Sequence, residues 1–198
     1  MLKQALGAAV LLFAGFVSQA MAQGKVAILM PGAGGAVPSD FLVRNQSRIG
    51  DKGVRTVVTT SSSEAASISQ QEAASGSKVI LVAMSRGAVD AAGAVAGGAK
   101  LNGLVIVSGV LREARQTLGS PSLLPRTLLI HNKNDACELT QPQFAQEFAA
   151  WSGGRASVRW VNVSGPPVPR ECGPFGAHGF HRQDGGAVAA INGFINAR

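Results

Sequence analysis

Six apolar runs rich in Val, Ile and Leu alternate along the chain with segments of helical composition. The runs are residues 25–30, 54–60, 78–83, 101–107, 126–131 and 156–163. The segments of helical composition are residues 39–50, 63–75, 86–97, 141–151 and 184–197. Several runs are nearly continuous in aliphatic residues, as strands are when helices cover both faces of their sheet. This alternation predicts an α/β fold with a doubly wound, mostly parallel sheet of about six strands.

The first 22 residues have the three-part layout of a secretory signal peptide. A single lysine precedes an uncharged apolar run at residues 5–17, and Ala20 and Ala22 are the small residues that a signal peptidase recognises. The apolar run is shorter than the roughly 20 residues of a membrane-spanning helix. We therefore expect residues 1–22 to be removed and no stable membrane insertion afterwards. Residues 23–198 would form one domain in the periplasm or outside the cell.

The composition indicates a folded domain rather than a disordered or nucleic-acid-binding chain. Hydrophobic residues make up 46% of the sequence and charged residues 15%, which argues against disorder. The formal charge is +7, but Lys and Arg are scattered and aromatic residues do not interleave with them. We therefore expect no nucleic-acid partner. The His and Cys residues show no metal-ligand spacing, so we expect no metal and no cofactor.

A serine stands at the junction between the third apolar run and the helical segment after it. Ser85 has the small residues Ala83 and Gly87 two positions before and two positions after it. This spacing is typical of a nucleophile elbow, a tight and strained turn that exposes the hydroxyl above the sheet. The amide of Arg86 would then point at the oxyanion that forms on attack. The alternative interpretation is a serine that caps a helix, which is common.

Two residues farther along follow the order nucleophile, acid, base. Asp135 comes shortly after the fifth apolar run, so it lies at the carboxyl edge of the sheet, where open α/β sheets place their sites. His178 lies between small residues in a loop just before the last helical segment and could reach over that edge. His181 is the competing candidate for the base. Taken singly, the aspartate could be a turn former and the histidine a surface-loop residue.

A glycine-rich segment, residues 31–35, follows the first apolar run. Its glycines allow backbone amides to approach an acyl oxygen, as the second half of an oxyanion hole requires. The rival interpretation is a phosphate-binding loop. No Lys-Ser or Lys-Thr pair follows, however, and the glycine spacing of dinucleotide sites is absent. The four elements, each after a predicted strand and in the expected order, predict the site of a serine hydrolase.

The chain resembles small exported members of the α/β-hydrolase superfamily from its first predicted strand to its last helix. The matching stretches are PGAGG, DFLVRN, VAMSRGA, LLIHNKNDAC and CGPFGAHGF. Some secreted members of this kind have Arg-Gly after the nucleophile, a Cys after the acid and another Cys before the base. The sequence departs from the common pattern at Ala83, where Gly is usual, and at Pro31, where many relatives have His.

The resemblance implies a triad of Ser85, Asp135 and His178, with oxyanion donors from the backbone amides of Ala33 and Arg86. The implied activity is hydrolysis of an acyl bond, of ester type, in a small-molecule substrate through an acyl-enzyme. Residues 108–125, where many relatives insert a helical cap, form only a short stretch, so we expect no large cap and an open cleft. Esters, thioesters and amides all fit such a triad, and no particular oligomeric state is indicated.

Two other classes of function remain as alternatives. A non-catalytic protein with the same fold could bind a ligand or a partner, since fold does not determine function. The complete set of triad residues favours the enzyme over this alternative. A flavodoxin-like binding module would share the strand rhythm but would not need Asp135 or His178 at these positions.

The two cysteines are expected to form a disulfide. An even pair in an oxidising compartment is more often bonded than free. Cys137 follows Asp135 by two residues and Cys172 precedes His178 by six. In a working triad the loops of the acid and the base must meet, which would also bring the two sulfurs close together.

Overall fold

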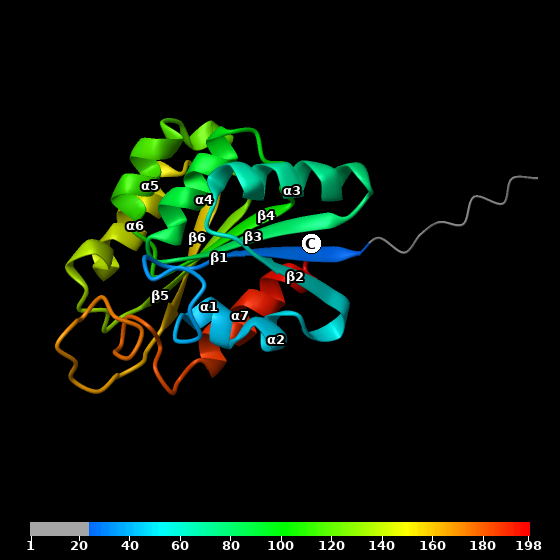
Figure 1. The fold of residues 1–198 in the computed structure, drawn as a ribbon. Coiled ribbons are helices and arrows are strands. Elements are labelled where there is room, and N and C mark those ends of the chain that lie inside the picture. Colours follow the sequence, from blue (N-terminus) through cyan, green and yellow to red (C-terminus); the bar gives the residue numbers. More distant parts are fainter. Residues whose placement is uncertain (1–23) are drawn as a thin grey trace, which may run out of the picture.

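A six-stranded parallel sheet forms the centre of the structure, a computed structural model in which residues 24–198 are described (Figure 1). The strand order is β2-β1-β3-β4-β5-β6, and every neighbouring pair is parallel. The strands are β1 Lys25–Met30, β2 Val54–Val58, β3 Lys78–Met84, β4 Gly103–Val107, β5 Thr127–Asn132 and β6 Ala156–Val161. The predicted doubly wound sheet is therefore confirmed. The predicted signal peptide lies outside the described residues.

Helices cover both faces of the sheet, as this fold class requires. One face carries α3 Ser62–Ala74, α4 Gly87–Ala96, α5 Leu111–Leu118 and α6 Pro142–Trp151. The other face carries α1 Phe41–Arg44, α2 Gln46–Ile49 and α7 Gly185–Asn196. Single turns of 3-10 helix lie in the connections, at η1 Asp51–Gly53, η2 Pro121–Leu123 and η3 Glu138–Thr140. Within residues 24–198, no helix has the length and apolar character needed to cross a membrane.

The structure differs from the sequence-based expectation in two helical regions. The predicted helix 39–50 is divided at Asn45, whose backbone leaves the helical region (φ −105°, ψ 9°) and whose side chain donates to the carbonyl of Phe41. Helix α5 lies in a stretch for which no helix is predicted. Its buried residues Leu111, Ala114 and Leu118 have helical spacing and join the core beside α4, so this stretch folds down onto the sheet.

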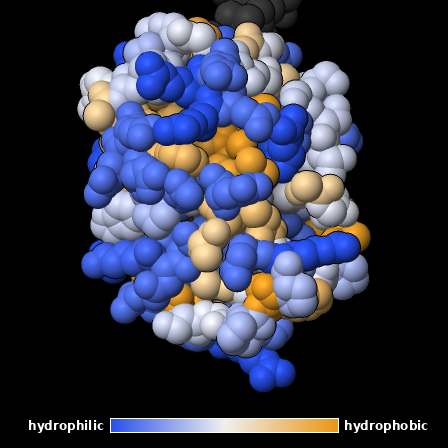
Figure 2. Space-filling model, turned by 90° about the vertical axis from the view of Figure 1, so that its left-hand side faces the viewer, coloured by the Kyte–Doolittle hydropathy of each residue, from blue (hydrophilic) through white to orange (hydrophobic). Residues whose placement is uncertain are grey.

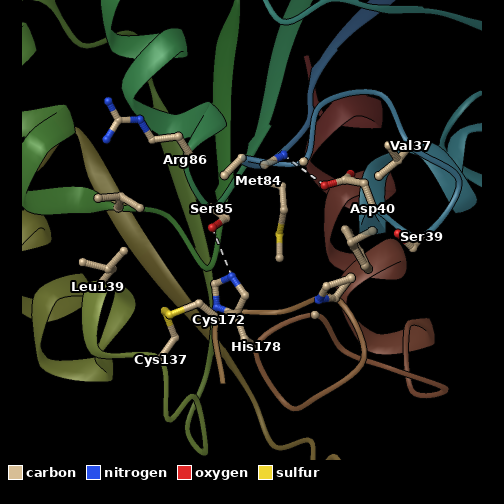
Figure 3. A pocket seen from close by; sticks show the side chains of 17 residues that line it. Val37, Ser39, Asp40, Met84, Ser85, Arg86, Cys137, Leu139, Cys172 and His178 are labelled. Atoms are coloured by element: carbon tan, nitrogen blue, oxygen red, sulfur yellow. Dashed lines mark hydrogen bonds between the residues drawn. A yellow bond between two sulfur atoms is a disulfide. The ribbon is translucent and has the colours of Figure 1, made fainter. Parts of the chain in front are cut away.

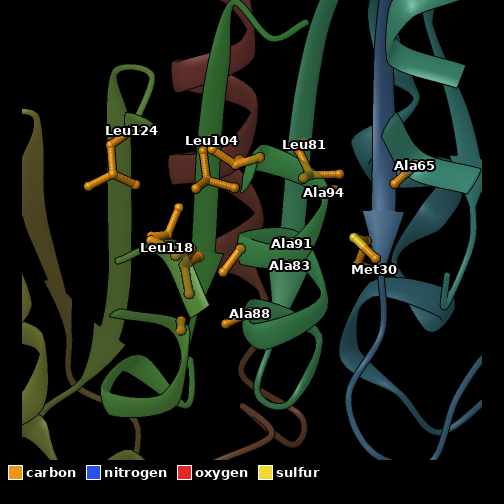
Figure 4. Packing of buried hydrophobic residues seen from close by; sticks show 14 of the residues in the cluster. Met30, Ala65, Leu81, Ala83, Ala88, Ala91, Ala94, Leu104, Leu118 and Leu124 are labelled. Carbon is orange, nitrogen blue, oxygen red and sulfur yellow. The ribbon is translucent and has the colours of Figure 1, made fainter. Parts of the chain in front are cut away.

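Strand residues alternate between two hydrophobic cores, one on each face of the sheet. In β3, for example, Leu81 and Ala83 face α4, whereas Ile80 and Val82 face α7. Because both faces are buried, the strand reads in the sequence as a continuous apolar run. Figure 4 shows how the alanines of α4 bring that helix close to the strands.

The first turn of α4 lies directly against the end of β1. A Cβ atom added to Gly87 would lie 2.2 Å from the carbonyl oxygen of Met30 and 2.4 Å from that of Pro31. These are backbone atoms that cannot turn aside, so only glycine fits at this position. This contact brings residues 31–35 to the turn that precedes α4.

Replacing Gly87 by Ala should therefore destabilise the fold, because the new methyl group has no room. We expect the free energy of unfolding to fall by about 1–3 kcal/mol, the usual cost of overpacking. Gly185 is a matched control, because it is the first residue of α7 and an added Cβ there meets nothing within 4 Å. Gly185→Ala should leave stability unchanged or slightly higher. Denaturant unfolding measures both variants, and equal effects would contradict the packing argument.

Candidate active site

Ser85 occupies a strained turn between β3 and α4. Its φ angle is +52°, in the left-handed region that side chains rarely adopt. The turn is held by backbone hydrogen bonds: Ser85 N–H donates to the carbonyl of Val107 at 3.0 Å, and its own carbonyl accepts from Ala88 and Val110 at 3.1 and 3.0 Å. The half-buried side chain opens at the carboxyl end of the sheet. This is the strand–turn–helix setting that a nucleophile elbow requires.

The structure brings the three predicted triad residues together (Figure 3). The Nε2 atom of His178 lies 3.1 Å from the hydroxyl oxygen of Ser85. The Nδ1 atom of the same ring lies 3.0 and 3.2 Å from the two carboxylate oxygens of Asp135. His178 is only 2% exposed and Asp135 only 5%. A proton on Nδ1 facing the carboxylate leaves the Nε2 lone pair directed at the serine hydroxyl.

His181, the other candidate for the base, lies in a different environment. Its half-buried ring packs edge-on against Phe175, with 5.5 Å between the ring centroids. No side-chain hydrogen bond connects it to Ser85 or Asp135 among the described residues.

Side chains from two other elements hold the backbone on both sides of His178. From the end of β5, the buried Asn132 donates through Nδ2 to the carbonyl of Ala177 at 3.0 Å. From α1, Arg44 donates through Nη2 to the carbonyl of Gly179. The segment between β6 and α7 that carries His178, here called the base loop, has no regular secondary structure. These hydrogen bonds therefore set the position of its backbone. No motif in the sequence predicts either contact.

Arg44 also joins the base loop to its neighbours. Its Nη1 atom donates to the carbonyl of Ser39 at 2.7 Å, in the loop after β1. Its Nη2 and Nε atoms contact the carboxylate of Asp184, at the start of α7, at 2.7 and 3.1 Å. One guanidinium group thus connects the loop after β1 with Gly179 and Asp184, which lie 135 and 140 residues farther along the chain, as its fixed fork of donors allows.

The predicted disulfide is present. Cys137 and Cys172, separated by 35 residues, are bonded and join the loop of Asp135 to the loop of His178. Cys137 is buried and Cys172 is exposed, and both line the cleft beside the serine. The disulfide therefore forms part of the wall of the site.

The loop after β1 supplies a backbone amide close to Ser85. Asp40 accepts hydrogen bonds from Gly32 N–H at 2.9 Å and Leu42 N–H at 2.8 Å, which fixes the loop at the start of α1. The amides of Ala33 and Arg86 have no acceptor within the described part of the chain. Asp40 lies inside the predicted helical segment 39–50, whereas in the structure it is the N-cap of α1, a position that Asp favours.

The cleft around Ser85 is open and mostly apolar, with a volume of about 570 Å³. Val37 and Leu139, 40% and 51% exposed, flank it on opposite sides (Figure 3). On the face that bears the strand ends, Figure 2 shows an apolar hollow surrounded by hydrophilic residues. The side chain of Arg86, at the edge of the cleft, pairs with Glu113. No group of His, Cys, Asp and Glu side chains within residues 24–198 is arranged to hold a metal ion.

A second buried histidine lies behind the carboxylate. The Nε2 atom of His131 is 2.7 Å from the carbonyl oxygen of Thr140 and 3.7 Å from Asp135 Oδ2. Burial lowers the pKa of His131, although Asp135 and the Thr140 carbonyl act in the opposite direction. The ring is therefore neutral at pH 7 and donates Nε2–H to Thr140. It forms no ion pair that would compete for the charge of Asp135.

This shifted pKa makes the stability depend on pH. Below its ordinary value of 6.5, the unfolded chain binds a proton at His131 that the folded chain excludes. The free energy of unfolding should therefore fall as the pH falls below about 6.5, by at most ~1.4 kcal/mol per pH unit from this group. His131→Gln, which keeps a donor for Thr140, should lose this contribution. Denaturant unfolding of both proteins between pH 5 and 7.5 checks it; a pH-independent difference between them would contradict the assignment.

Solved structures similar to this chain share its fold at low sequence identity. An alpha-beta serine hydrolase homologue from Coxiella burnetii has a TM-score of 0.63 at 16% identity, covering 86% of this chain and 84% of its own. Esterase 2 of Thermogutta terrifontis, phosphoramylated by tabun, has a TM-score of 0.58 at 13% identity, covering 88% and 83%. An alpha/beta hydrolase enzyme from the metagenome of lagoon sediments at Mar Chica, Morocco, has a TM-score of 0.61 at 16% identity, covering 89% and 92%.

Comparison with protein-family models gives no match, and comparison with curated protein sequences gives none either. The structural likeness extends over more than four-fifths of each chain. The resemblance inferred from the sequence is thus confirmed at the level of architecture: the chain has the α/β-hydrolase fold.

Proposed function

We propose that this protein is a serine hydrolase that cleaves an acyl bond, of ester type, in a small-molecule substrate. The observation that carries the proposal is the continuous contact from Ser85 Oγ to His178 Nε2, at 3.1 Å, and from His178 Nδ1 to Asp135, at 3.0 Å. A strained serine, a buried imidazole and a buried carboxylate in this order form the arrangement that activates a hydroxyl for attack.

In the first half of the reaction, Ser85 Oγ attacks the acyl carbon while His178 Nε2 takes the hydroxyl proton. Asp135 stabilises the imidazolium that results. The tetrahedral oxyanion accepts hydrogen bonds from the amides of Ala33 and Arg86, which lack other acceptors. Collapse of this intermediate breaks the bond to the leaving alcohol, which receives the proton from His178.

In the second half, water attacks the acyl-enzyme while His178 takes a proton from it. The second tetrahedral intermediate then collapses to the carboxylic acid, and His178 returns the proton to Ser85 Oγ. No segment within residues 24–198 closes over the cleft: residues 108–125, where a cap could be inserted, contain α5, which packs beside α4 and α6, and the short η2. Water can therefore reach the acyl-enzyme directly, as hydrolysis requires.

The walls of the cleft favour an uncharged acyl group. They are largely apolar, and the charged groups at the edge are already engaged: Arg86 with Glu113, and Asp40 with two backbone amides. An anionic or cationic acyl group would lose solvation without gaining a free partner. Accessible esters of small apolar acids fit this environment.

The disulfide supports an oxidising compartment for the proposed enzyme. Such bonds persist in oxidising compartments and are rare where glutathione keeps thiols reduced. The Cys137–Cys172 bond supports a place in the periplasm or outside the cell. The proposal of an exported enzyme also rests on the signal peptide predicted for residues 1–22.

The first test is labelling with a fluorophosphonate, which reacts with activated serines. The purified protein should be labelled and should hydrolyse p-nitrophenyl acetate, whereas Ser85→Ala should be unlabelled and lose about 10⁴- to 10⁶-fold in kcat. Ser108, at the end of the next strand, is a matched control: Ser108→Ala should remain labelled. Absence of labelling in the folded wild-type protein would favour the alternative, a non-catalytic protein that binds a ligand in the same cleft.

The second test separates the two histidines. His178→Ala should lose about as much activity as Ser85→Ala, because the two side chains act as a unit, and the double variant should be little worse. His181→Ala should keep most of its activity, since its ring packs against Phe175 instead. Steady-state kinetics of Ser85→Ala, the two histidine variants and the double variant decides which histidine is the base. The reverse order of the histidine effects would assign the base to His181.

A further inference from the structure

A fourth polar side chain completes the contact between the acid and the base. Thr140, the last residue of η3, is fully buried, and its hydroxyl lies between the two groups. The Oγ1 atom is 2.9 Å from Asp135 Oδ2 and 3.0 Å from His178 Nδ1. Thr140 does not line the cleft, so it cannot touch a substrate there.

We propose that Thr140 is a positioning residue for the proposed hydrolysis, which acts by fixing the orientation of Asp135 and the tautomer of His178. The inference rests on the proposed function. It adds a residue that the elbow, acid and base motifs do not contain.

The argument begins with the single hydrogen of the hydroxyl group. Asp135 in its ionised form can only accept, so Thr140 donates to Oδ2 and its lone pairs face His178 Nδ1. Every group around Nδ1 is then an acceptor: two carboxylate oxygens and one hydroxyl oxygen. Only the tautomer with a proton on Nδ1 is stable in such surroundings. That tautomer leaves Nε2 unprotonated toward Ser85, as a general base requires.

The same hydroxyl fixes the plane of the carboxylate. Oδ1 of Asp135 accepts from the amide of Cys137 at 3.1 Å, and Oδ2 accepts from Thr140. With one donor on each oxygen besides His178 Nδ1, the carboxylate cannot rotate about its Cβ–Cγ bond without losing a buried hydrogen bond. Removal of the hydroxyl would leave only one of these two donors.

Thr140 itself is held from two sides. Its amide donates to the carbonyl of Cys137 at 3.0 Å, and its carbonyl accepts from His131 Nε2 at 2.7 Å. The neutral His131 and the disulfide-bonded Cys137 thus fix the backbone that carries the hydroxyl. A hydroxyl so constrained can set the geometry of its neighbours rather than adapt to them.

Two substitutions separate the hydroxyl from the rest of the side chain. Thr140→Val keeps the shape and removes the hydroxyl, whereas Thr140→Ser keeps the hydroxyl and removes the methyl group. Thr127→Val is the matched control: Thr127 begins the same β5 strand that precedes the acid, is also buried, and donates to the carbonyl of Pro125 at 2.9 Å. It therefore loses a comparable hydrogen bond at the other end of the sheet.

Steady-state hydrolysis of p-nitrophenyl acetate by the wild type and these variants tests the proposal. Thr140→Val should lower kcat on the order of 10- to 100-fold, the size expected from a misplaced base, with little change in KM. Thr140→Ser should restore most of kcat, and Thr127→Val should match the wild type. If thermal unfolding shows that Thr140→Val is not folded, Thr140→Ala, which removes the same hydroxyl, replaces it in the experiment.

A double-variant comparison distinguishes positioning from a loss of stability. In an Asp135→Asn background, Thr140→Val should cost almost nothing further in kcat, because the group it positions is already gone. Equal kcat for Thr140→Val and wild type, or fully additive losses with Asp135→Asn, would overturn the positioning role. These results would leave the proposed function intact, provided that Ser85→Ala is inactive. Equal hydrolysis by the wild type and Ser85→Ala would overturn both.

Discussion

The arrangement of the site depends on one interaction, the hydrogen-bonded contact between the Asp135 carboxylate and the His178 ring. The two residues are 43 positions apart, and His178 lies in a loop without regular structure. A buried carboxylate is costly unless its oxygens find donors, so Asp135 both requires the imidazole and holds it. The disulfide, Asn132 and Arg44 restrict the same loop from three other directions. The contact is therefore set by the fold before any substrate arrives.

The two halves of the site are held by different kinds of force. The half that contains Ser85 is built from backbone packing, since the strained turn is bonded to β4 and α4 and the Gly87 contact presses it against the end of β1. The half that contains His178 is built from side-chain hydrogen bonds between distant segments. Backbone packing tolerates almost no added volume at the contact point. In a hydrogen-bonded network, by contrast, the loss of one side chain disturbs the geometry only in part.

This difference explains how much the sequence could predict. The strands, the elbow around Ser85 and the glycine-rich loop have local signatures, because periodicity and small residues at fixed offsets are visible in a short window. Once the elbow had identified Ser85, the chain order nucleophile, acid, base pointed to Asp135 and His178. Thr140, Arg44 and Asn132 could not be found in this way. Each contacts His178 or its direct neighbours, which are close to it only in the folded chain, and no spacing in the sequence marks such a contact.

Because the cleft beside Ser85 is open, the residues around it are not shielded from water by a lid within the described chain. The described structure protects the base side instead: His178 and Asp135 are 2% and 5% exposed, and Thr140 is fully buried, whereas Ser85 is only half-buried. Charges in such a buried pocket interact more strongly than in water, so in the proposed mechanism Asp135 would stabilise the imidazolium with little screening. Water can still enter beside the serine, where the proposed acyl-enzyme would be hydrolysed. With the proposed base buried and the proposed nucleophile accessible, the site combines weak screening of charge with access for water. A closing lid would have to provide these two conditions one after the other.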